Sequence, residues 1–194
     1  MIAEDLLELL DKDLLDGELL DPPPETWKEM MKLPTHIKVV WETGFKTELK
    51  GLFKAETFAI KEKPANAPVI PVTAKFRCKL KANGMVDKPK VRVCFRGDLQ
   101  KDHIDGDTFT PIANFRELRR YLATAAAKGV RIYQLDFIGA FLQAYTKQIT
   151  YTYLPKEWAY LVPEYAEYFG VPLLVVKALY HTSGFWTNDT YLIK

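Results

Sequence analysis

The feature that most limits the possible folds is an apolar stripe at helical spacing in residues 38–54, followed by two stretches that fit strands. The stripe consists of Trp41, Phe45, Leu49, Leu52 and Phe53. Such a face is more typical of a protein core than of a binding surface. Residues 74–81 and 90–96 are the strand candidates, and Asn83-Gly84 between them is a hairpin turn signal. The pattern predicts an α+β fold.

The rest of the chain predicts shorter elements. Gly129 stands just past the end of one expected helix, where glycine commonly terminates helices. Helices are predicted over 25–32 and 116–128, strands over 130–136, 149–154 and 173–177, and mainly irregular chain over 61–73, 97–113 and 155–172.

Residues 1–25 form a separate leader. They contain leucines at helical spacing among nine Asp/Glu and one Lys, and the run Pro22-Pro23-Pro24 ends the predicted helix. The chain is therefore expected to contain two units. They are the acidic leader with its proline linker (1–25) and one larger domain (26–194). No apolar run approaches the roughly 20 residues of a membrane span. The acidic start fits neither a signal nor a transit peptide, so an intracellular protein without a membrane partner is expected.

Charge is concentrated in the middle of the chain. Residues 26–101 contain 17 Lys/Arg and seven Asp/Glu, whereas residues 102–194 are balanced. A basic segment of this kind favours either a surface that faces phosphates or a solvated lysine-rich face. Cys78 and Cys94 are too few for a disulfide framework, and the histidines lack the spacing of a zinc site.

The strongest local motif is QLDFIGAFL at residues 134–142. Asp136 follows an apolar strand candidate, a place where a carboxylate can hold Mg²⁺ for phosphoryl transfer. Taken alone, Asp136 could equally be the N-cap of a helix over 138–144.

Several blocks together resemble the copia-type retrotransposon reverse transcriptases. The family patterns are KARLVxRGxxQ, ETFSPV, QLDVxxAFL, IYxxxP and KxLY. The similar blocks here occur in the same order and are KVRVCFRGDLQ (90–100), DTFTPI (107–112), QLDFIGAFL (134–142), YTYLP (151–155) and VKALY (176–180). The resemblance extends over about residues 35–186. It implies polymerase fingers with a hairpin and packed helices, and an incomplete palm sheet.

The resemblance also implies roles for individual residues. Asp136 would be the first catalytic aspartate, and the Phe137 carbonyl would be a second ligand oxygen on the same Mg²⁺ ions. Phe141 would exclude a ribose 2′-hydroxyl, or else it is an ordinary core residue. Three basic residues on the hairpin, Lys79, Lys81 and Arg92, would bind the incoming triphosphate. Arginine is the better candidate, and either lysine could instead belong to a solvated strand face.

The sequence departs from the family in the acidic residues that would hold metal ions. Two-metal catalysis needs several carboxylates, yet these 194 residues contain no Asp-Asp pair. The expected function is therefore that of a reverse transcriptase fragment, an RNA-directed DNA polymerase inactive as an isolated chain. Its partners would be template-primer, deoxynucleoside triphosphates and the remainder of a Pol polyprotein. Its expected location is a cytoplasmic virus-like particle or the nucleus. The alternatives are a nucleic-acid-binding remnant without catalysis and an unfolded product.

Overall fold

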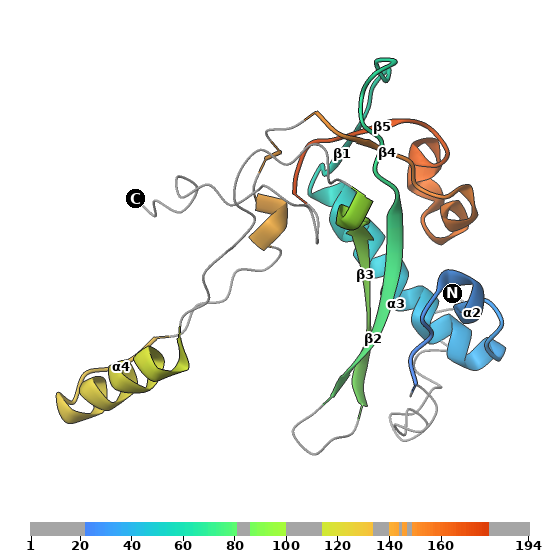
Figure 1. Ribbon diagram of the computed structural model, residues 1–194. Coiled ribbons are helices and arrows are strands. Elements are labelled where there is room, and N and C mark those ends of the chain that lie inside the picture. The colour runs from blue at the N-terminus through green and yellow to red at the C-terminus, as the bar shows by residue number, and fades with distance from the viewer. Residues whose placement is uncertain are drawn as a thin grey trace.

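The computed structural model describes residues 22–80, 86–99, 114–133, 140–143, 145–146 and 149–178. A long helix, α3 (Thr35–Lys54), runs beside a two-stranded ribbon of β2 (Val72–Leu80) and β3 (Val86–Phe95) (Figure 1). The leader helix predicted within residues 1–21 lies outside the described part.

Helix α3 confirms the predicted stripe. Its buried residues are Val40, Trp41, Phe45, Leu49, Leu52 and Phe53. They recur every three to four positions, so they lie on one side of the helix. That side packs on the ribbon and on the short elements of residues 156–168, which makes α3 the centre of the core.

The ribbon is the predicted hairpin. Its strands pair antiparallel from Val72 with Phe95 to Leu80 with Val86, and a register shift follows Lys79. The turn signal Asn83-Gly84 lies outside the described residues. The backbone N–H of Val93 points away from β2, since it donates to a side chain of α3. Pro89 lies four residues before Val93 in β3, so its backbone nitrogen points away from β2 as well. The missing N–H of this proline therefore removes no hydrogen bond between the two strands.

A second sheet joins distant parts of the chain. It contains β1 (Phe58–Ile60), β5 (Leu173–Val175) and β4 (Tyr151–Thr152), paired antiparallel in the order β1-β5-β4. Residues 68–70 cover the outer side of β4, since Ile70 N donates to Tyr151 O at 2.9 Å and Tyr151 N donates to Pro68 O at 2.9 Å. This network fixes the start of β2 against the second sheet.

Short helices pack on the buried side of α3 next to the ribbon. They are α2 (Trp27–Met30) and the 3-10 helices η4 (Lys156–Leu161) and η5 (Pro163–Tyr168). Tyr165 of η5 stacks on Phe53 with ring centroids 4.4 Å apart. At the surface, Lys50 forms an ion pair with Glu164 at 2.9 Å. Tyr160 donates a hydrogen bond to Glu42, which together with burial raises the pKa of its phenol.

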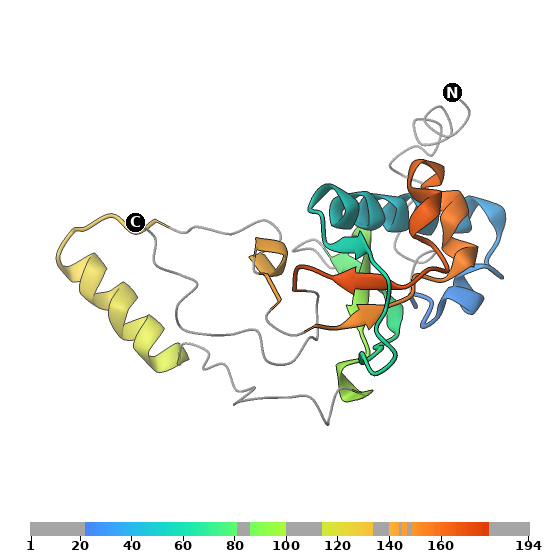
Figure 2. The same ribbon diagram turned by 90° about the horizontal axis from the view of Figure 1, so that it is seen from above.

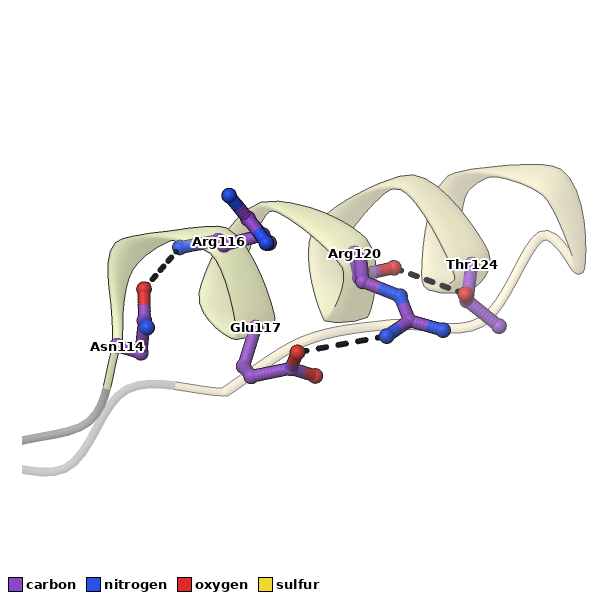
Figure 3. Close-up of polar contacts among 5 residues, drawn as sticks. All are labelled: Asn114, Arg116, Glu117, Arg120 and Thr124. Atoms are coloured by element: carbon purple, nitrogen blue, oxygen red, sulfur yellow. Dashed lines mark hydrogen bonds and ion pairs between the residues drawn. The ribbon is translucent and has the colours of Figure 1, made fainter.

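Helix α4 (Phe115–Ala127) lies apart from this body in both views (Figures 1 and 2). Local contacts organise it (Figure 3). Asn114 Oδ1 accepts from Arg116 N at 2.9 Å and caps the first turn, and Thr124 donates to the Arg120 carbonyl at 2.8 Å. N-capping thus gives Asn114 a local role. No described helix is long and apolar enough to cross a membrane.

Several predicted elements differ from the structure. Residues 130–133 form no strand, so that prediction is wrong there, and residues 134–136 lie outside the described part. Tyr133 is 79% exposed, and no described strand pairs with this segment. A strand without a partner leaves its backbone groups to water. Of the helix expected over 138–144, the structure describes residues 140–143, which form the 3-10 helix η3 (Ala140–Gln143).

Replacing Phe45 by alanine should destabilise the body strongly. The Phe45 ring is fully buried and contacts rings from three other elements. The expected loss in free energy of unfolding is about 3–5 kcal/mol, measured by urea denaturation followed by tryptophan fluorescence. Phe115→Ala is the matched control, since this side chain is 75% exposed and should cost about 0.5 kcal/mol or less. Equal losses for the two variants would contradict the described core.

Candidate functional site

One face of the ribbon is strongly basic. In β2, Lys75, Arg77 and Lys79 alternate with residues of the other face. Lys75 pairs with Arg92 and Arg77 pairs with Lys90 across the ribbon. Like charges directly opposite each other destabilise a sheet. These cross-strand pairs therefore do not themselves stabilise the ribbon.

The opposite face determines where the cations point. Ala74, Phe76, Val91 and Val93 are buried against α3. Because successive strand residues alternate between faces, the residues between them must lie on the solvent side. Lys75, which follows Ala74, is accordingly exposed.

The basic face borders a cavity of about 380 Å³. Five cationic side chains and both cysteines of the chain line it: Lys75, Arg77, Cys78, Lys79, Lys90, Arg92 and Cys94. This lining contains no acidic side chain. Five clustered cations create a positive potential suited to phosphates or other polyanions.

The half-buried Glu48 and the buried Cys94, both near the cavity, have shifted pKa values. Burial raises the pKa of the Glu48 carboxyl, whereas its hydrogen bond from Val93 N and the charges of Arg92 and Lys90 lower it. Burial and the neighbouring Glu48 raise the pKa of the Cys94 thiol. Cys94 is 2% exposed, so it is a neutral packing residue, as expected for a buried free thiol.

The structure brings together two of the residues selected from the sequence. Lys79 and Arg92 both line the cavity. Lys81, Asp136 and Phe137 lie outside the described residues, as does the side chain of Phe141, whose backbone belongs to η3.

Sequence reasoning missed Lys75, Arg77 and Lys90 as site residues. The alternation of cations every second residue in both strands was the available signal. It also missed Glu48, because only the tertiary packing brings this residue of α3 next to β3.

The described residues give no metal centre. In this part of the chain, no group of three or more His, Cys, Asp or Glu side chains could hold a metal ion. The expected Mg²⁺ site depends on Asp136 and Phe137, and the described geometry does not include them. A carboxylate and a backbone carbonyl are the hard oxygen ligands that Mg²⁺ prefers, so the residue types fit this ion.

No protein-family model matches the chain, and no solved structure matches it. The chain is similar to the retrovirus-related Pol polyprotein from transposon TNT 1-94 of Nicotiana tabacum, with 29% identity over 139 residues. The match covers 70% of this chain but only 10% of the tobacco protein, so the chain spans about a tenth of that protein's length. The similarity relates the chain to one segment of a transposon-encoded Pol polyprotein.

Proposed function

We propose that the chain is a fingers and partial-palm segment of a retrotransposon reverse transcriptase, and that its β2–β3 ribbon binds nucleic-acid or nucleotide phosphates. The observation that supports this most directly is the cavity lined by five cations. The similarity to a transposon Pol polyprotein supports the retrotransposon origin.

The spacing of the cations suits a phosphate backbone. Residues two apart in a strand are about 6.8 Å apart, so Lys75, Arg77 and Lys79 form a row along β2. A second row on β3 includes Lys90 and Arg92. Two parallel rows of cations can contact successive phosphates along an extended strand. Arginine adds paired N–H donors that match two phosphate oxygens.

In the proposed polymerase, Asp136 and the Phe137 carbonyl hold Mg²⁺, and Phe141 excludes the ribose 2′-hydroxyl. When bound, Mg²⁺ neutralises charge that develops on the transferred phosphoryl group. Lys79, Lys81 and Arg92 bind the triphosphate of the incoming nucleotide and keep it oriented. Further carboxylates must come from outside these 194 residues, because the sequence contains no Asp-Asp pair.

A second candidate function is nucleic-acid binding without catalysis. One observation favours it: the described part of the ribbon has five cations around one cavity, whereas the sequence contains no Asp-Asp pair. Both candidates predict binding of polyanions, and they differ only in nucleotide incorporation.

Removing cations from the ribbon should weaken nucleic-acid binding and its salt dependence together. For Lys75→Ala combined with Arg77→Ala, the slope of log affinity against log salt should fall by about 1.4, since each lost phosphate contact to a single strand removes about 0.7 unit. Fluorescence anisotropy with a labelled single-stranded oligonucleotide at several salt concentrations measures this slope. Lys46→Ala combined with Lys50→Ala removes two exposed charges from α3 and is the control. Equal slopes for both double variants would overturn the ribbon as the interface.

The isolated chain should not extend a primer. A single candidate aspartate cannot hold two metal ions, so no incorporation of deoxynucleotides is expected above background. A primer-extension assay with Mg²⁺ and a template-primer tests this, with Asp136→Asn as the matched variant. Incorporation that Asp136→Asn abolishes would show that the chain alone is an active polymerase.

A further inference from the structure

Glu48 of α3 is an acid that contacts the basic ribbon directly. Its Oε1 accepts a hydrogen bond from the Val93 backbone N–H at 3.2 Å, across 45 residues of sequence. The bonded N–H lies on the outer edge of β3, next to Arg92 in the chain. Glu48 therefore both fixes this strand edge and places a negative charge behind a cavity lined by cations.

We propose that Glu48 is a positioning residue that sets how strongly the ribbon binds anions. Binding of a polyanion favours protonation of Glu48, and protonation of Glu48 favours binding of the polyanion. This inference rests on the proposed phosphate-binding function of the ribbon and adds to it a dependence on pH.

The close packing of α3 on β3 allows the Glu48 side chain to reach Val93. Gly44 lies one helical turn earlier, and a Cβ atom there would stand 3.5 Å from Val91 Cγ2. Helix and strand are thus in close contact on this side, and the next turn of the helix brings Glu48 to Val93. Without the carboxylate, the outward N–H of Val93 would lose its acceptor, and the strand edge would be open to other partners.

The groups around Glu48 determine whether its protonation strengthens or weakens anion binding. The charged and titratable groups of β3 near Glu48 are Lys90, Arg92 and Cys94. Lys75 and Arg77 of β2 in turn influence the charge state of Cys94. Burial is the larger influence and raises the pKa of Glu48, whereas Arg92 and Lys90 lower it.

A bound polyanion offsets the field of these cations and adds negative charge nearby. The protonated form of Glu48 is then favoured further, and the pKa of Glu48 rises on binding. By linkage, the proton must strengthen anion binding to the same extent. Affinity should therefore increase as the pH falls through the pKa of Glu48.

The test compares Glu48→Gln with wild type in binding to labelled oligothymidylate at low salt, from about pH 8 to about pH 5. The phosphodiesters of this probe stay ionised throughout. Glutamine keeps an acceptor for the Val93 N–H and removes the charge. At pH 8 the variant should bind on the order of threefold to tenfold more tightly than wild type. Its affinity should also change less with pH.

Glu167→Gln is the matched control, because it removes the same charge from an exposed position on η5 outside the cavity lining. It should reproduce the wild-type affinity and pH profile. A Glu48→Gln variant with wild-type affinity and pH profile would overturn the role of Glu48 and leave the proposed function intact. Failure of wild type to bind at low salt would overturn both.

A second measurement keeps the test decisive if Glu48→Gln does not fold. The Glu48 carboxyl of the wild-type protein can be titrated by carbon-detected NMR with and without oligothymidylate. Its midpoint should move to higher pH in the complex. An unchanged midpoint with the probe bound would overturn the coupling.

Discussion

Phe45 on α3 packs against Trp27, Phe76 and Trp158, which belong to α2, β2 and η4, with ring centroids 4.8–6.1 Å apart. These four rings join segments up to 131 positions apart in the sequence. Each buried aromatic removes a large apolar area from water, and edge-on contacts add to this stabilisation. Because Phe76 belongs to the ribbon, the same cluster fixes which face of β2 is buried and which faces solvent.

The basic surface is a consequence of that constraint. Once Phe76 points into the core, Lys75 and Arg77 must point outward, since side chains alternate along a strand. The cross-strand pairs of like charge then oppose ribbon formation, and the packing of α3 on the apolar face must offset them. Glu48 contributes on the same helix by occupying the outer edge of β3. Thus the core holds together a surface whose charges repel one another.

The second sheet and α4 make a different contribution. Pairing of β1 with β5 brings residues 58–60 against residues 173–175, which are distant in the sequence. Helix α4 is organised by its own cap and local hydrogen bonds and lies apart from that body. The segment with Asp136 follows α4 in the chain. The basic ribbon thus belongs to the packed body, whereas Asp136 and Phe137 lie outside the described residues.

The sequence by itself determined α3, the ribbon and α4, because their periodicity and end signals are local: Gly129 follows α4, and cations alternate with apolar residues in β2. It also identified Lys79 and Arg92 as candidate site residues. Only the tertiary structure decided that both belong to one cavity with Lys75, Arg77 and Lys90, since this depends on the strand register. Neither the absence of the strand expected at residues 130–133 nor the proximity of Glu48 to Val93 was predictable, because strand pairing and contacts across 45 residues depend on the packing of the whole body.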